Sequence, residues 1–284
     1  MDTILHLLAL EPAAAEILVV DQSERHETAT VAQLETLAAG GKIKWIRLLH
    51  PSITHAMNVG LLECRSEIVL FLDDDILPGG DLLRGHLDAH ARGSVNIVAG
   101  QILQPWEEAL PEDLEPEPFR FCSSRRASVA ELMGGNFSVR RDVAVRLGGF
   151  DENFVHVAYR FEAEFCDRAR AAGESILFEP RASIRHLKVT HGGTRSFGHH
   201  LTTIRPSHAV GAYYYLFRAR DVRRRWLQLL ARPLRAVRTR HHLVRPWWIP
   251  GTLISELAGL FWAIGLALRG PRLLRNEPRN GTRS

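Results

Sequence analysis

The chain has 284 residues, 45% of them hydrophobic, and a formal net charge of +4. These values exclude a disordered chain and predict one α/β domain of about 200 residues with an appendage. The three cysteines, Cys64, Cys122 and Cys166, are too few and too scattered for a disulfide framework or a zinc cluster, which favours a reducing compartment.

The charge is unevenly divided along the chain. Residues 1–217 carry 21 basic and 29 acidic side chains, a net charge of −8, whereas residues 218–284 carry 15 arginines and 3 acids, a net charge of +12. The basic character therefore belongs to the C-terminal part. No secretory signal is predicted, because Met1-Asp2 opens with an acid and lacks a basic segment before the apolar stretch 4–10.

Helix and strand signals alternate in the first half of the chain. Helices are expected over 3–14 and 54–64, and strands over 16–23, 43–49 and 67–72. This order indicates an α/β fold with a mainly parallel sheet flanked by helices. Right-handed crossovers bring the carboxyl ends of such strands to one edge, where we expect Asp21 and the acids at 73–75.

The second half continues the pattern with a longer loop. A helix is expected over 81–92, a strand over 96–102 and a loop over 103–118, which holds four prolines and many acids. A short helix ends at Gly148-Gly149, a longer one covers 160–172, and strands over 176–178 and 182–187 complete the domain, the last ending near His186.

Three adjacent acids, Asp73, Asp74 and Asp75, follow the apolar run 68–72, which is typical of a strand covered on both faces. Like charges so close repel one another unless a hard divalent cation with oxygen ligands lies among them, which indicates Mn²⁺ or Mg²⁺ better than Zn²⁺. Asp73 and Asp75 point to the same side of an extended chain. The alternative is a solvated acidic turn before a helix that begins near Asp81.

Seven short motifs, in this order, resemble the family 2 glycosyltransferases, which have the GT-A fold. They are Val19-Val20-Asp21, Asn58-Val59-Gly60, Phe71-Leu72-Asp73-Asp74-Asp75, Gly134-Gly135-Asn136-Phe137, Gly148-Gly149-Phe150-Asp151-Glu152, Glu162-Ala163-Glu164-Phe165 and His186-Leu187. The resemblance covers residues 3–195 and implies transfer of a sugar from a nucleotide diphosphate sugar, commonly a uridine diphosphate sugar, with inversion at the anomeric carbon. A metal bridging carboxylate and diphosphate oxygens would stabilise the departing charge.

The resemblance also implies roles for single residues. Asp75 is the first choice for the metal contact, Asp73 assists it, and either Asp73 or Asp74 accepts a ribose hydroxyl. His186 matches the frequent third metal contact of the family. Asp21 would read the nucleobase or ribose, with Asn58 orienting the same region. The residues themselves, rather than the resemblance, indicate that Arg195, in a glycine-containing loop at 191–195, could pair with the diphosphate; the alternative is a flexible surface loop.

Single-displacement transfer needs one carboxylate to take the proton of the acceptor hydroxyl. Glu162 stands where the family carries its catalytic acid, although Phe161 replaces the acid that usually precedes it. The alternative is that Glu162 and Glu164 are ordinary acids at a helix N-terminus.

A second departure is the absence of the family's first strand and its Pro-Thr-Tyr-Asn-like turn. Either the protein starts upstream of Met1 or the sheet lacks a central strand, in which case a catalytically inactive subunit that binds a membrane or a protein is the alternative function. Nucleotidyl transfer would need a glycine-rich, lysine-bearing phosphate loop, which is not found near the N-terminus.

The part after residue 217 predicts a separate tail, 218–284, attached to a transferase domain, 1–217. Residues 218–245 hold ten arginines and one acid among apolar residues, which predicts a basic amphipathic helix, broken near Pro233, on an anionic membrane. No nucleic-acid motif accompanies it, so no nucleic-acid partner is expected.

Residues 247–268 carry a single charge, Glu256, and we expect them to lie on the membrane rather than span it. The alternative is a helical pair packed on the body. The expected location is cytoplasmic, peripheral to the inner face of the cell membrane, with a lipid-linked or polysaccharide acceptor.

Overall fold

The computed structural model describes residues 1–274, except 93–94, 189–192, 194–196 and 220–221. The body contains α1 (Asp2–Leu8), β1 (Leu18–Asp21), α2 (Thr28–Ala39), β2 (Lys44–Arg47), α3 (Ile53–Glu63), β3 (Ile68–Leu72), β4 (Ile76–Pro78), α4 (Leu82–Ala91), β5 (Ile97–Leu103), β6 (Ala127–Val129), β7 (Asn136–Arg140), α5 (Arg141–Arg146), α6 (Phe161–Ala171) and β8 (Ile176–His186). The C-terminal helices are the 3-10 helix η2 (Pro206–His208), α7 (Ala209–Arg218), α8 (Val222–Val237), α9 (Arg240–Val244), the 3-10 helix η3 (Pro246–Trp248) and α10 (Ile249–Arg269).

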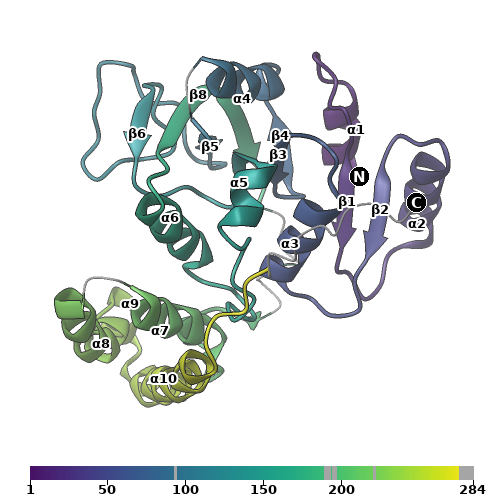
Figure 1. Ribbon diagram of the computed structural model, residues 1–284. Coiled ribbons are helices and arrows are strands. Elements are labelled where there is room, and N and C mark those ends of the chain that lie inside the picture. The colour runs from purple at the N-terminus through teal and green to yellow at the C-terminus, as the bar shows by residue number, and fades with distance from the viewer. Residues whose placement is uncertain (93–94, 189–192, 194–196, 220–221, 275–284) are drawn as a thin grey trace, which may run out of the picture.

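A six-stranded sheet forms the centre of the body, in the order β3-β7-β5-β8-β4 with β6 beside β8 (Figure 1). β5 and β8 pair in parallel, whereas β7 runs antiparallel to both β3 and β5, so β3, β5 and β8 point the same way. The expected α/β class is confirmed, but the sheet is mixed rather than mainly parallel. The reason is that β4 and β7 follow their predecessors through turns and loops, without the helical crossover that a parallel pair requires.

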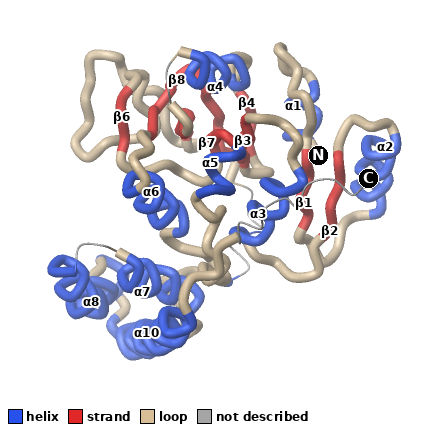
Figure 2. Tube along the Cα trace, viewed as in Figure 1, coloured by secondary structure: helices blue, strands red, loops and turns tan. Residues whose placement is uncertain are grey.

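β1 and β2 form a separate parallel pair, joined through α2, which stands to one side of the larger sheet (Figures 1 and 2). Among the described residues, β1 makes no ladder with β3. α1 lies against β4 instead, where the Thr3 hydroxyl is 2.6 Å from the Asp74 carbonyl oxygen and 3.0 Å from that of Ile76. The acidic turn is therefore tied to the N-terminal helix through its backbone.

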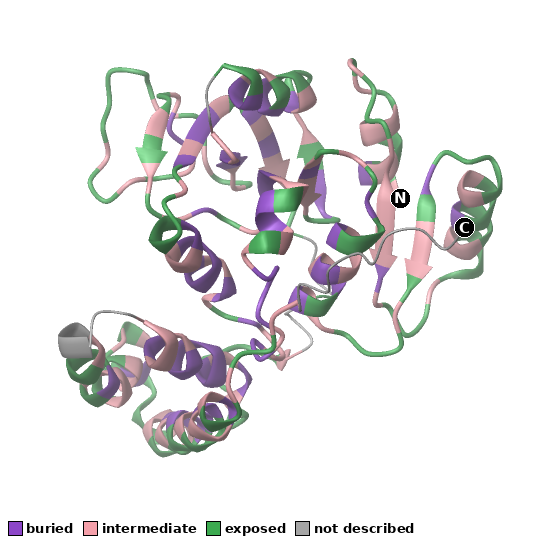
Figure 3. Ribbon diagram, viewed as in Figure 1, coloured by how far each residue is buried: buried purple, intermediate pink, exposed green. Residues whose placement is uncertain are grey.

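The core of the body lies between the larger sheet and α5 and α6, where buried residues gather (Figure 3). Phe137 of β7 stacks on Phe71 of β3 at 4.9 Å, and Phe150 packs on Phe165 of α6 at the same distance. These rings fix α6 against the sheet, which in turn sets the direction of the first turn of α6.

The C-terminal helices form one unit below the body (Figure 1). α7 packs along α10, and α8 packs against both. α7 crosses the expected domain boundary after residue 217 and packs with the helices that follow it. After α10 the chain returns to the body, where the Leu274 N–H donates to the Gly148 carbonyl at 2.8 Å and the Glu152 N–H to the Arg272 carbonyl at 3.0 Å.

Three expected elements differ in the structure. The strands expected over 176–178 and 182–187 are one strand, β8, which carries its irregularity where the register with β5 shifts between Gly100 and Gln101. The expected break near Pro233 is wrong, because α8 continues through it; the buried Leu229 anchors the helix on the core and offsets the lost backbone hydrogen bond. The helix expected over 3–14 ends already at Leu8.

Candidate active site

Two carboxylates and one imidazole meet at the turn between β3 and β4. His186 Nε2 lies 2.9 Å from Asp75 Oδ1 and 3.6 Å from Asp73 Oδ2. The pairing of β4 with β8 sets Ile76 opposite His186, and the Leu187 N–H donates to the Asp75 carbonyl at 2.7 Å. The backbone of two strands thus fixes the spacing of the three side chains.

This trio has the chemistry of a divalent-cation site. One ligand atom from each of Asp73, Asp75 and His186 lies within 4.8 Å of the others. Two carboxylates and an imidazole suit Mn²⁺ or Mg²⁺. His186 Nδ1 is buried and has no hydrogen-bond partner among the described residues, so no second bond holds the ring against turning toward a cation. Asp75 is buried, whereas Asp73 and Asp74 are exposed.

Gly134 and Gly135 separate this trio from Glu162. The Asp73 N–H donates to the Gly135 carbonyl at 3.3 Å, and a Cβ on Gly135 would lie 2.5 Å from Asp73 Oδ2. A Cβ on Gly134 would lie 3.1 Å from Glu162 Oε1. The two glycines therefore let a carboxylate from the end of β3 and another from α6 approach the same stretch of backbone.

Glu162 is the second residue of α6, and its surroundings shift the pKa of its carboxyl. Burial raises its pKa to about 7, and the charge of Asp73 adds to the rise, while the N–H groups of Gly134 and of Glu162 itself oppose it. A carboxylate that changes protonation near neutral pH is suited to act as a general base. The structure thus brings Glu162 to the site predicted from the acids and His186.

The nucleotide-side candidates lie on other elements. Asp21, at the end of β1, is buried, and its carboxylate accepts hydrogen bonds from the Ser23 N–H at 2.9 Å and Trp45 Nε1 at 3.0 Å, besides a 2.6 Å contact with His26 Nε2. These bonds hold its pKa below the ordinary range although desolvation acts the other way. Its contact with a nucleotide stays a prediction.

Asn58 is buried on α3 and holds the loop after Gly149. Its Nδ2 donates to the Phe150 carbonyl at 2.8 Å and to Glu152 Oε1 at 3.1 Å, and its Oδ1 accepts from the Phe150 N–H at 2.8 Å. In the structure Asn58 positions the loop at 150–152, and its role in orienting a nucleotide stays a prediction. Arg195 lies outside the described residues.

Sequence reasoning missed several residues around the site. Lys188, two residues after His186, holds its ammonium 4.0 Å from the centre of the exposed Trp106 ring. Arg218 of α7 lies between two buried carboxylates, Asp151 and Glu164. Asp151 and Glu164 belong to two of the seven motifs found in the sequence. No local pattern in the sequence predicted that Arg218 would lie between them.

The chain matches the family described as Glycosyl transferase family 2 over residues 2–144. The Glucosyl-dolichyl phosphate glucuronosyltransferase of Haloferax volcanii is 26% identical over 149 residues, which are 47% of this chain and 47% of that protein. The chain thus matches about half the length of that relative.

Two solved structures resemble the fold. The mannosyltransferase PcManGT of Pyrobaculum calidifontis, in complex with GDP-Man and Mn²⁺, has a TM-score of 0.54 at 19% identity, over 95% of this chain and 73% of that one. GalNAc-T7, crystallised with UDP, GalNAc and Mn²⁺, has a TM-score of 0.51 at 12% identity, over 72% of this chain and 45% of that one. The family match spans half of the chain and the structural likeness extends over the whole body, so this chain belongs to glycosyl transferase family 2 and has the GT-A fold.

Proposed function

We propose that the protein is a metal-dependent inverting glycosyltransferase, which transfers a sugar from a nucleotide diphosphate sugar to a lipid-linked or polysaccharide acceptor. The observation that carries the proposal is the meeting of Asp73, Asp75 and His186 with Glu162 across Gly134 and Gly135. The named relatives support it, since one acts on a glucosyl-dolichyl phosphate and two structures hold Mn²⁺ with UDP or with GDP-Man.

Each residue has one task in this proposal. Asp73, Asp75 and His186 would hold the cation, which, when bound, would stabilise the negative charge of the departing diphosphate. Glu162 takes the proton of the acceptor hydroxyl as its oxygen attacks the anomeric carbon opposite the diphosphate. The bond to the diphosphate breaks as the new glycosidic bond forms, so the configuration inverts and no covalent intermediate is needed. Asp21 and Asn58 would lie on the nucleotide side.

Calorimetry of nucleotide binding tests this proposal first. We expect UDP or GDP to bind with Mn²⁺ or Mg²⁺, and to bind weakly with chelator. Asp75→Asn should lower the affinity on the order of 100-fold, about 2.7 kcal/mol, because it removes the buried carboxylate beside His186. Asp81→Asn, which changes an exposed carboxylate outside the trio, should bind like the wild type.

Turnover separates an enzyme from an inactive binding subunit. Metal-dependent nucleotide binding without release of nucleotide from UDP-glucose, UDP-glucuronic acid, UDP-N-acetylgalactosamine or GDP-mannose would support the inactive subunit. Failure of both nucleotides to bind under every metal condition would contradict the proposed donor site itself.

The proposal includes docking of the C-terminal helices on an anionic membrane. α8 exposes Trp226, Leu227, Leu230 and Leu234 at helical spacing, and the exposed arginines Arg235, Arg238, Arg240 and Arg245 follow them. Such a face buries its apolar side chains at the lipid boundary while the arginines meet anionic headgroups. The same proposal places the protein on the cytoplasmic face of the cell membrane.

We place α10 along the membrane rather than across it. The segment Pro246–Arg269 is long and apolar enough to span a bilayer. However, Glu256 in its middle is buried against α8, with its carboxylate 2.9 Å from Arg232 Nε, and Gly259 packs closely on Ala209 of α7. A spanning α10 would have to leave these partners and carry Glu256 into lipid, which costs about 2.5–3.5 kcal/mol on insertion scales.

Vesicle co-sedimentation tests the docking surface. We expect binding to phosphatidylcholine vesicles with 30% phosphatidylglycerol and much weaker binding to phosphatidylcholine alone. Leu230→Glu combined with Leu234→Glu should lower binding roughly tenfold or more, since it removes two apolar contacts and adds like charge. Leu49→Glu, at a leucine that is more exposed than either of these but lies on the body, is the matched control. Equal sedimentation of all three proteins would contradict the docking surface.

A further inference from the structure

The segment that leads into α6, residues 151–160, has an unfavourable backbone conformation and therefore needs support from its surroundings. Three of its non-glycine residues, His156, Ala158 and Arg160, have positive φ angles of 59°, 52° and 74°. L-residues adopt this region at a cost in free energy, and such residues persist where neighbouring structure fixes them. Arg160, the last of them, is the N-cap of α6, and its side chain makes no capping hydrogen bond. Glu162 follows two residues later.

α7 and the 3-10 helix before it supply that support. A Cβ on Gly211 would lie 2.6 Å from the Tyr159 carbonyl oxygen and 3.0 Å from its nitrogen, so α7 touches the segment backbone to backbone. His156 Nδ1 lies 3.0 Å from the Ser207 hydroxyl, and the Arg160 guanidinium lies 4.7 Å from the centre of the Tyr215 ring. The 3-10 helix and α7 together thus contact the segment at each of its strained positions or beside them.

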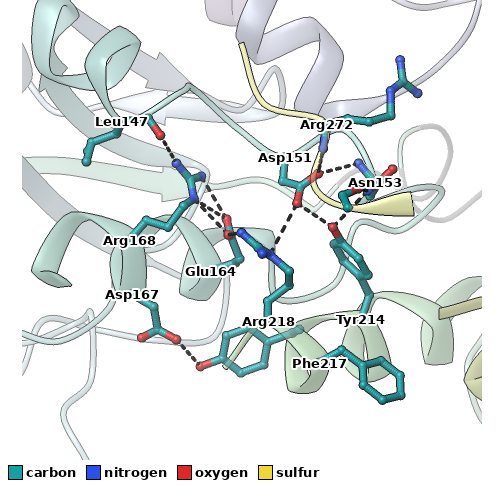
Figure 4. A network of polar contacts seen from close by, with 12 residues as sticks. Leu147, Asp151, Asn153, Glu164, Asp167, Arg168, Tyr214, Phe217, Arg218 and Arg272 are labelled. Carbon is teal, nitrogen blue, oxygen red and sulfur yellow. Dashed lines mark hydrogen bonds and ion pairs between the residues drawn. The ribbon is translucent and has the colours of Figure 1, made fainter. Parts of the chain in front are cut away.

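The last turn of α7 also joins both ends of the segment (Figure 4). At the start of the segment, Asp151 Oδ2 accepts a hydrogen bond from the Tyr214 hydroxyl at 2.7 Å. Beyond the end of the segment, in the first turn of α6, Glu164 Oε1 accepts a hydrogen bond from Arg218 at 3.3 Å. The Nε of the same arginine lies 3.8 Å from Asp151 Oδ2. Asp151 and Glu164 are both buried, and Arg168 binds Glu164 through its Nε at 2.9 Å. One guanidinium therefore ties the beginning of the segment to the first turn of α6.

We propose that Arg218 and Tyr214 of α7 are positioning residues for Glu162, so that the C-terminal helical unit sets the geometry of the general base. The inference rests on the proposed role of Glu162. Asp73 and Asp75 lie in the turn between β3 and β4, and His186 lies at the end of β8, outside these contacts. Disturbing Arg218 should therefore displace the base and leave the metal and nucleotide site in place. A small displacement of a catalytic group from outside the reacting atoms is enough to slow the reaction by about 100-fold.

Kinetics and binding of matched variants test the proposal. Arg218→Met should lower kcat on the order of 10- to 100-fold, with the dissociation constant of UDP or GDP in Mn²⁺ within about twofold of the wild type. Arg218→Lys should recover part of kcat, because the positive charge stays near Glu164. Tyr214→Phe should lower kcat by about 3- to 10-fold, since it removes two hydrogen bonds, the one that the hydroxyl donates to Asp151 and the one that it accepts from Asn153. Arg269→Met, an exposed arginine of the same unit, is the control.

Amide hydrogen exchange gives a readout that does not depend on turnover. In Arg218→Met and Tyr214→Phe we expect residues 151–165 to exchange roughly tenfold faster or more, and residues 68–75 to exchange as in the wild type. Tyr214→Phe keeps the test decisive if Arg218→Met does not fold. Unchanged exchange at 151–165, or a fall in kcat that only follows loss of nucleotide binding, would overturn the proposal. A wild type that turns over no donor contradicts the proposed function, while the exchange comparison still decides whether α7 holds the segment.

Discussion

At the scale of single residues, the pKa of Glu162 links the structure to the pH dependence of the reaction. In the proposed mechanism Glu162 accepts the proton as a carboxylate, and its pKa is raised to about 7, so we expect kcat/KM to fall about tenfold per pH unit below pH 7 and to level off above it. Burial is the largest cause of the raised pKa and the Asp73 charge a smaller one, so a bound cation would lower the midpoint of the pH profile only in part.

Glu162→Gln should lower kcat by about 100- to 10,000-fold with nucleotide binding unchanged. A variant with wild-type turnover would remove Glu162 from the mechanism.

The raised pKa of Glu162 also makes stability depend on pH. Activity is expected to rise with pH, whereas the contribution of this carboxyl to stability falls as the pH rises. A carboxyl whose pKa is raised in the folded state binds its proton more tightly there, so its contribution is favourable below pH 4.5 and is lost as the pH rises through 7. We therefore expect Glu162→Gln to raise the free energy of unfolding at pH 8 by roughly 1–3 kcal/mol, and by much less at pH 4. Urea denaturation at the two pH values measures the difference. Equal effects at both would mean that the carboxyl is solvated.

Gly135 provides a residue-scale test of the proposed metal site in which none of the three ligand residues is substituted. An added Cβ would lie 2.5 Å from Asp73 Oδ2, so Gly135→Ala must displace that carboxylate. We expect the metal-dependent affinity for UDP or GDP to fall about tenfold or more, measured by calorimetry. Gly80→Ala, whose Cβ would meet nothing within 4 Å, should bind like the wild type. If the two variants bind alike, Asp73 is not needed for the cation.

At the scale of elements, α4 and β7 share a buried polar chain that should make the fold sensitive to acid. His86 Nδ1 and His90 Nε2 each lie 2.8 Å from the Ser138 hydroxyl, and burial lowers the pKa of His86 to about 4. Because the unfolded chain takes up the proton near pH 6.5 and the folded one does not, stability falls as the pH drops from 6.5 to 4, by about 3 kcal/mol at most. His86→Gln should flatten this fall in urea denaturation series. An unchanged slope would place the acid-sensitive group elsewhere.

Whether an element could be predicted from the sequence depends on how far along the chain its contacts lie. The apolar run of β3 and the acids after it could be predicted because the signal is local. β7 was missed, since its Asn136 and Ser138 are polar but buried. Asn136 donates to the carbonyls of Gln101 at 3.0 Å and Ala182 at 2.8 Å, both more than 30 residues away. The same reasoning applies to the site. Asp75, Glu162 and His186 carry recognisable chemistry, whereas the Arg218 contacts depend on packing that no local pattern encodes.

At the scale of the whole molecule, the end of the described chain ties the helical unit to the body. The Arg272 N–H donates to Asp151 Oδ1 at 2.9 Å, and the neighbouring backbone bonds join 272–274 to 148–152. Leu274 packs on Gly149, which has a positive φ of 62° and no side chain to hinder the approach. Residues 272–274 therefore add a hydrogen bond to the same Asp151 carboxylate that Tyr214 and Arg218 contact. The C-terminal helices and the body share one polar network as a result.

This sharing predicts how two shortened chains differ. A chain that ends at Gly270 loses four hydrogen bonds and the packing of Leu273 and Leu274, and we expect the free energy of unfolding to fall by about 3–5 kcal/mol. For a protein of this size that is a fall in Tm of roughly 5–15 °C. A chain that ends at Leu274 keeps every one of these contacts and should melt like the full chain in differential scanning calorimetry. If both shortened chains melt alike, the segment at 271–274 does not hold the two parts together, and the route from the C-terminal helices to Glu162 would run through α7 alone.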